Sequence, residues 1–134
     1  MPDQKEILAE EQVNVLAPFL EAAQAIAVLD HRSVEAPHVR GEAQKLIALL
    51  QDTPTISRRH LSELALSQLE MAQLLLESVK DWIEVANSVK SRRTASVRFR
   101  SAIKALARVN RLLTSLIKAQ AAAQKSQQAW AQRR

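Results

Sequence analysis

The sequence contains no cysteine and no tyrosine, and its 134 residues include only one glycine, two phenylalanines and two tryptophans. Without cysteine the chain cannot form disulfides, thiolate metal sites or a cysteine nucleophile. The near-absence of glycine excludes the Gly-rich loops that cradle phosphates, and it removes the turn-bounded strands expected of a sheet protein. The remaining residues are dominated by Ala, Leu, Gln, Glu, Lys and Arg, which favour helices because they lose little side-chain freedom there. The composition therefore predicts an all-α protein.

Long apolar runs are missing as well. No stretch of about 18 apolar residues occurs, so no membrane-spanning helix is predicted. Residues 1–6 lack the basic start and the continuous apolar segment of a secretory signal. These absences, together with the lack of cysteine, favour a cytoplasmic protein. A length of 134 residues predicts one helical-bundle domain spanning residues 1–134.

Two shorter helices are predicted in residues 1–51. The first extends from about residue 4 to residue 29, and Pro18 within it predicts a kink or a break, because proline lacks the N–H group and clashes with the preceding turn. Residues 30–33 then form a loop. The second helix covers residues 37–51, with proline tolerated in its first turn.

Two longer helices are predicted in the rest of the chain: a long helix over residues 54–90 with Thr53 as its N-cap, and a basic helix over residues 94–134 that ends in an Ala/Gln-rich tail. In one continuous rod their apolar faces would lie about 150° apart, so one partner could not bury both. We therefore predict a turn near residues 91–94, capped by Thr94 or Ser96. The result is a small bundle of about four helices, built on a long antiparallel hairpin. A continuous helix exchanged between two copies is the alternative, since no Gly or Pro enforces the turn.

Charge is divided unevenly along the chain. All 14 acidic side chains lie in residues 1–84, while residues 85–134 contain 12 of the 19 Lys and Arg, so the two parts carry −7 and +12. Several of these bases recur close to a seven-residue spacing that places them on one side of the last helix, opposite its apolar face. This set, the basic row, comprises Arg93, Arg100, Lys104, Arg108, Arg111, Lys118 and Lys125. An acidic row on the preceding helix, Glu63, Glu70, Glu77 and Glu84, has the same spacing and also faces outward, so we do not expect the two rows to neutralise each other within one chain.

A straight row of Lys and Arg suits the regular negative charge of a phosphate backbone. The candidate nucleic-acid-binding residues are therefore Lys90 and the basic row. Phe99 belongs to the apolar face, so the base stacking used by single-strand binders is not supported. We predict sequence-independent binding of RNA or DNA within a larger nucleoprotein assembly, with an acidic protein surface as the other possible partner. The charged rows also predict an oligomer or a subunit of a complex, and no membrane partner.

The alternative function is a protein–protein adaptor or chaperone whose bundle is completed by a partner helix, and in that case changes at Leu106 or Leu113 should impair function. Catalysis is not predicted, because no activated nucleophile and no Gly-rich loop is present. Glu35 and His38 have the Glu-x-x-His spacing of dimetal helical bundles, but those sites need a second copy and further carboxylates. No metal site and no cofactor are therefore predicted.

Overall fold

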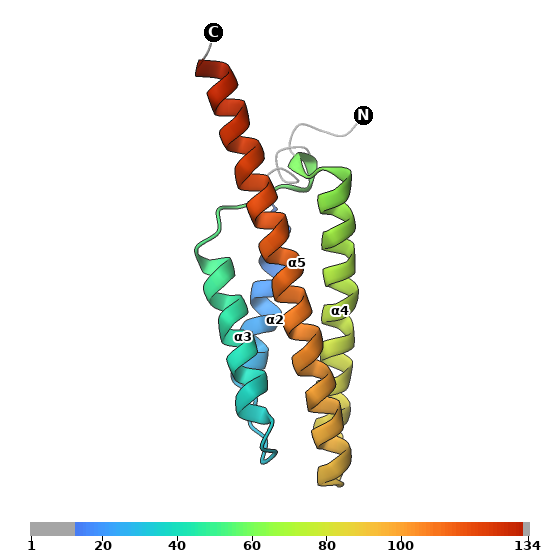
Figure 1. Ribbon diagram of the computed structural model, residues 1–134. Coiled ribbons are helices and arrows are strands. Elements are labelled where there is room, and N and C mark those ends of the chain that lie inside the picture. Colours follow the sequence, from blue (N-terminus) through green and yellow to red (C-terminus); the bar gives the residue numbers. More distant parts are fainter. Residues whose placement is uncertain (1–12, 133–134) are drawn as a thin grey trace.

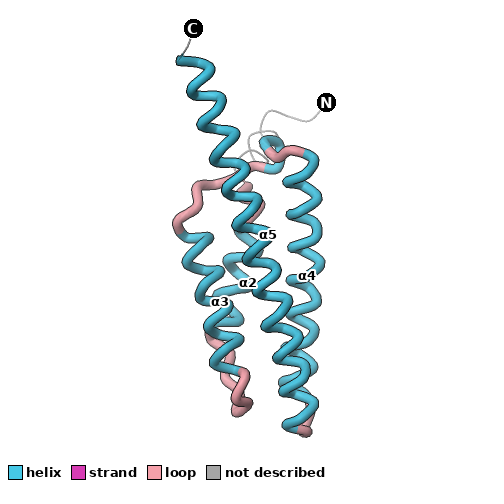
Figure 2. The backbone as a smooth tube through the Cα atoms, in the orientation of Figure 1, coloured by secondary structure: helices cyan, strands magenta, loops and turns pink. Residues whose placement is uncertain are grey.

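The computed structural model describes residues 13–132 (Figure 1). Within this range it contains four α-helices, one short 3₁₀ helix and no strand. The elements are α2 (Ala17–Ala27), α3 (Ala36–Gln51), η1 (Arg58–His60), α4 (Glu63–Ser88) and α5 (Arg92–Gln132). Figure 2 shows the loops that connect the four α-helices, of which the one between α4 and α5 is the shortest. The predicted all-α bundle is confirmed, and no helix among residues 13–132 has the length and hydropathy needed to cross a bilayer.

The predicted antiparallel hairpin is formed by α4 and α5, which lie side by side in opposite directions (Figure 1). The helix is not continuous, because residues 89–91 separate α4 from α5. The residues predicted to cap the start of α5 were wrong. The hydroxyl oxygen of Ser91 accepts a hydrogen bond from the backbone N–H of Thr94 at 3.3 Å, so Ser91 caps α5 in place of Thr94 or Ser96.

The start of α4 also differs from the prediction. Residues 54–62 do not extend this helix; they form a loop that contains η1. Thr53, which was predicted to cap the helix, donates its hydroxyl to the carbonyl oxygen of Leu49 at 2.7 Å and closes the end of α3 instead. Ile56 and Leu61 are both buried. The loop path is therefore favoured because it brings two large apolar side chains into the core.

Ser62 is the residue that begins α4, since its hydroxyl oxygen accepts the backbone N–H of Ala65 at 3.1 Å. We expect Ser62→Ala to lower the free energy of unfolding by about 1 kcal/mol, because the helix would lose its side-chain cap. Urea denaturation of the two proteins measures this difference. Ser67→Ala, at an exposed position further along α4, is the matched control and should change stability by less than about 0.5 kcal/mol. Equal losses in the two variants would contradict the capping role of Ser62.

Pro18 marks the beginning of α2, where it occupies the first turn. The predicted break at this proline is confirmed, and the four residues before α2 are not helical. That segment is tied to the loop before α4: the N–H of Val15 donates to the carbonyl oxygen of Ile56 at 2.9 Å, and the side-chain oxygen of Asn14 accepts the N–H of Ile56 at 3.2 Å. The predicted helical residues 4–12 lie outside the described part of the chain.

The core consists of two clusters of buried side chains, and each cluster receives residues from all four α-helices. Phe19 of α2 is fully buried in the first cluster, and Phe99 of α5 is fully buried in the second. The two shorter helices thus cover the apolar side of the α4–α5 hairpin, as predicted. This packing fixes the orientation of α5, whose opposite side remains exposed.

The C-terminal part of α5 projects beyond the rest of the bundle (Figure 1). The side-chain amide of Gln120 donates to the carbonyl oxygen of His60 at 3.1 Å. Residues 121–132 after this contact are exposed throughout.

Candidate nucleic-acid interface

The basic row occupies the outer side of α5. All seven of its members are exposed, and the residues that alternate with them toward the core are buried. Because α5 is uninterrupted from Arg92 to Gln132, the seven-residue spacing holds these side chains in line. From Arg93 to Lys125 the row extends for about 48 Å at 1.5 Å per residue. Lys90, the remaining candidate, precedes the helix and is also exposed.

Two members of the basic row make contacts that shape the surface. The Nε atom of Arg100 lies 3.9 Å from a carboxylate oxygen of Glu35, so part of its charge is compensated. An Nη atom of Arg108 lies 3.7 Å from the sulfur of Met71 on α4. Within residues 13–132, the other five members have no carboxylate at ion-pair distance. Most of the positive charge of the row is thus available to a ligand.

Glu35 connects the loop before α3 to the first turns of α5. Its side chain is only 16% exposed and accepts hydrogen bonds from the hydroxyls of Ser33 and Ser96. The bond from Ser33 and then the bond from Ser96 stabilise the charged carboxylate and lower the pKa of Glu35 below its ordinary value, and Arg100 adds a smaller effect. Glu35 therefore holds the base of α5 in place as an anion.

This lowered pKa predicts a pH-dependent part of the stability. A carboxyl whose pKa is lower in the folded state stabilises the fold above its ordinary pKa, and that contribution is lost as the pH falls through the lowered value. We expect the free energy of unfolding to decrease as the pH falls below about 5, and Glu35→Gln to reduce this decrease. Urea denaturation at a series of pH values measures it, and Ser96→Ala should act in the same direction. An unchanged pH profile in Glu35→Gln would contradict the proposal that this carboxylate stabilises the fold.

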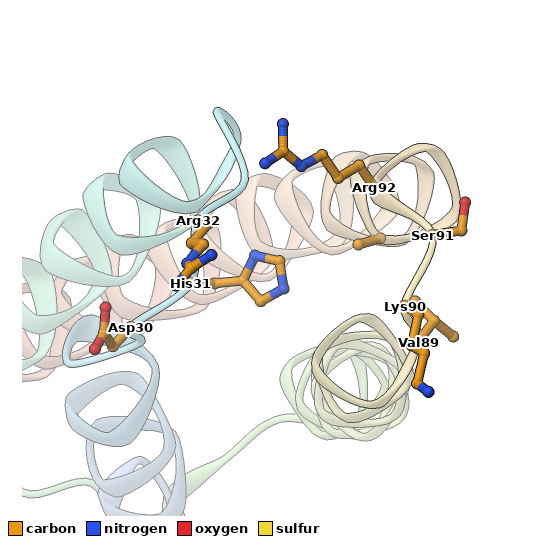
Figure 3. A pocket seen from close by; sticks show the side chains of 8 residues that line it. Asp30, His31, Arg32, Val89, Lys90, Ser91 and Arg92 are labelled. Carbon is orange, nitrogen blue, oxygen red and sulfur yellow. The ribbon is translucent and has the colours of Figure 1, made fainter.

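A surface cavity of about 460 Å³ lies where the loop after α2 meets the start of α5 (Figure 3). In Figure 3 the ring of His31 points toward α5, and the side chain of Arg92 extends back toward the loop. Arg32 and Lys90 also line the cavity, against a single carboxylate from Asp30. The cavity continues the cationic surface past the end of the basic row.

Sequence reasoning missed Arg32 and Arg92 as candidates. Arg32 lies in the acidic part of the chain, and only the packing of α2 and α3 on α5 brings it to this end of the bundle. Arg92 is the first residue of α5 and lies off the line of the basic row. Arg92 directly precedes Arg93, and this proximity to another basic residue was a sequence signal for adding Arg92 to the candidate site.

The acidic row is exposed on α4, and its ion pairs among residues 13–132 do not involve α5. Glu70 lies 3.9 Å from Arg58, and Glu77 lies 3.3 Å from Lys80 on the same helix. The prediction that the acidic and basic rows do not neutralise each other within one chain therefore agrees with the ion pairs found among residues 13–132. Both rows face outward and are accessible to other molecules.

The Glu-x-x-His pair does not converge on a common point. Glu35 is engaged by two serine hydroxyls, and His38 is exposed beside Glu42, with 3.7 Å between the nearest side-chain atoms. In the described part of the chain, no group of three or more His, Asp or Glu side chains could hold a metal ion.

No protein family, curated protein or solved structure matches this chain.

Proposed function

We propose that this protein is a non-enzymatic helical subunit that binds the backbone of RNA or DNA, without sequence specificity, through the basic row of α5. The observation that supports this most is the exposed, single-signed row on one straight helix, in a stretch of 50 residues without a carboxylate side chain. Neutralising phosphates with such a row releases condensed counterions, which is the main source of sequence-independent affinity. A cytoplasmic location and a place in a larger nucleoprotein assembly belong to the same proposal.

The chemistry between the basic side chains favours a phosphate backbone over an acidic protein surface. Protein interfaces usually contain apolar or aromatic anchors at their centre. The positions between members of the basic row are mostly small or polar, as at Ser101, Ala107, Thr114 and Ser115. Phe99 is buried in the core and cannot stack on a base. The row is therefore suited to contact phosphates and to follow the shape of the ligand.

A fluorescence-anisotropy titration tests this proposal. Labelled RNA, single-stranded DNA and double-stranded DNA would be titrated with the protein across a series of salt concentrations. We expect the logarithm of the binding constant to fall linearly with the logarithm of salt concentration, with a slope of about −0.9 for each duplex phosphate contacted. A slope corresponding to several phosphates would support binding through the row. No binding to any of the three at low salt would refute the proposal.

A specific observation favours the second candidate, a protein–protein adaptor. Leu64 and Leu74 on α4 are 70% and 72% exposed, which is high for large apolar side chains. Leu106 and Leu113, where changes were predicted to impair an adaptor, are buried in the core of the bundle. An adaptor would instead use the outer side of α4. Substitutions there would impair an adaptor and leave nucleic-acid binding by α5 intact.

A further inference from the structure

The outer side of α4 carries a line of exposed apolar side chains that the bundle does not cover. This apolar row consists of Leu64, Met71, Leu74 and Val85, which are 70%, 43%, 72% and 39% exposed. Three of them are separated by multiples of seven residues, and the fourth lies three residues after Met71. These four residues occupy the two core positions of a heptad register, in which the remaining positions between them, Ser67, Ser78 and Asp81, are polar.

The apolar row lies between the two charged rows. On one side is α5, because Met71 of the apolar row contacts Arg108 of the basic row. At 100° per residue, the acidic row lies roughly 90° away from the apolar row around the axis of α4. It lies on the side of α4 nearer to α2, because Glu84 and Ala25 of α2 line one cavity. Across this face of the hairpin, from α5 to the far side of α4, the order is therefore basic row, apolar row, acidic row.

The register of the hairpin places members of the acidic row and of the basic row at the same height, meaning the same position along the helix axes. Two contacts fix this register: Gln68 with Ser115 at 3.4 Å, and Met71 with Arg108 at 3.7 Å. Counting in opposite directions along α4 and α5 from these contacts aligns three acidic with three basic side chains. The level pairs are Glu63 with Lys118, Glu70 with Arg111, and Glu77 with Lys104.

We propose that this face binds a second copy of the chain, related by a two-fold axis parallel to α4 and α5. Such an axis reverses the order across the face and keeps every residue at its own height. The apolar rows then meet each other, and each acidic side chain faces the level basic side chain of the other copy. A two-fold axis perpendicular to the helices would place basic on basic and acidic on acidic. Charge complementarity therefore selects the parallel arrangement.

The two kinds of contact contribute differently. Burial of the apolar rows supplies the driving force for association, and the level charge pairs at the rim determine the orientation and make the association sensitive to salt. The self-association does not depend on the proposed function. It does engage Lys104, Arg111 and Lys118, so a nucleic acid and a second copy compete for the same side chains.

Cysteine cross-linking tests the orientation, because the natural chain has no cysteine. In the parallel arrangement Leu64 lies opposite itself, whereas in an antiparallel arrangement it lies opposite Val85. We expect Leu64→Cys to form a disulfide-linked dimer under mild oxidation. Val34→Cys, on the loop after α2 and 87% exposed, is the matched control and should remain mostly unlinked. A dimeric Leu64→Cys protein that does not cross-link overturns the arrangement.

Sedimentation velocity at low salt tests the association itself, without any nucleic acid present. We expect Leu74→Asp to raise the dimer Kd by at least about tenfold, with an unchanged circular-dichroism spectrum because Leu74 is exposed. A wild-type protein that stays monomeric at concentrations on the order of 100 µM overturns the proposal and leaves the apolar row to a different protein. Failure of the anisotropy titration would leave this result unaffected.

A charge exchange gives the strictest test of the pairing. One variant carries Glu70→Lys and Glu77→Lys, and the other carries Lys104→Glu and Arg111→Glu. Each variant alone places like charges opposite each other and should be monomeric. Their mixture restores opposite charges at every level on both sides of the axis and should form a heterodimer. A mixture that stays monomeric while the wild type dimerises overturns the proposed pairing.

Discussion

Changing Lys104, Arg111 and Lys118 to glutamate is expected to lower the affinity for duplex nucleic acid by at least about 100-fold at low salt, because three phosphate contacts become repulsive. These side chains are exposed at intervals of seven residues along α5 and are not held in ion pairs with other residues between 13 and 132. The salt dependence should weaken as well, by about 0.9 in slope for each duplex phosphate contact that is lost. The anisotropy titration across a salt series measures both quantities.

The control for this variant must have the same change in net charge. Lys45, Lys80 and Arg58 are exposed basic residues outside α5, and their replacement by glutamate also lowers the net charge by six. If binding depends on the row, this control retains most of the affinity. If both variants lose affinity equally, binding follows the overall charge of the protein, and the assignment of the site to α5 is wrong.

The largest effect on stability is expected for Phe99→Ala, which should lower the free energy of unfolding by about 3–5 kcal/mol. The ring of Phe99 is fully buried and packs in the same cluster as Ile26 of α2 and Val79 of α4, and the ring of His31 meets it at a centroid distance of 4.8 Å. Its removal would leave a cavity where three helices and a loop meet. The loss is large compared with the roughly 5–15 kcal/mol that stabilises a typical domain.

Thermal and urea denaturation would measure this loss, with a Tm lowered by roughly 10–18 °C for a chain of this length. Val97→Ala, two residues earlier on the same helix, is the matched control because Val97 is 48% exposed. It should lower stability by less than about 1 kcal/mol. Similar losses in the two variants would mean that Phe99 does not pack as described.

The hairpin could be predicted from the sequence because it follows from a regular property of the chain. The apolar residues of α4 and α5 keep their helical period, and the change of phase between them requires a turn. The outward direction of the basic row follows from the same period, since its members lie opposite Phe99 and Leu106. Both predictions depend only on neighbours along one helix.

The start of α4 could not be predicted in this way. Thr53 and Pro54 form a strong local signal for a helix start, and such a cap contributes about 1 kcal/mol. Burial of Ile56 and Leu61 against the bundle contributes more, at about 1.5–3 kcal/mol for each large apolar side chain. Tertiary packing thus overrides the local signal, and its partners lie far away in the sequence.

The same reason explains what was missed in the candidate site. Glu35 receives a hydrogen bond from Ser96, 61 residues away, and it draws Arg100 toward the loop before α3. Arg32 reaches the cavity at the start of α5 only through the folding of the bundle. Periodicity describes one helix at a time, so it gives no information about such pairs.

The projecting end of α5 has the geometry of a lever arm. Residues 121–132, which follow Gln120, are exposed, and about 18 Å of helix remain from Gln120 to Gln132 at 1.5 Å per residue. A bend of about 20° at that point, within the range of observed helix kinks, displaces the tip by about 6 Å. Lys125 lies on this arm, while the other six members of the basic row lie on the part of α5 before Gln120. In the proposed function, six charges of the basic row would therefore meet the nucleic acid on the part of α5 before Gln120, and Lys125 would meet it on the projecting end.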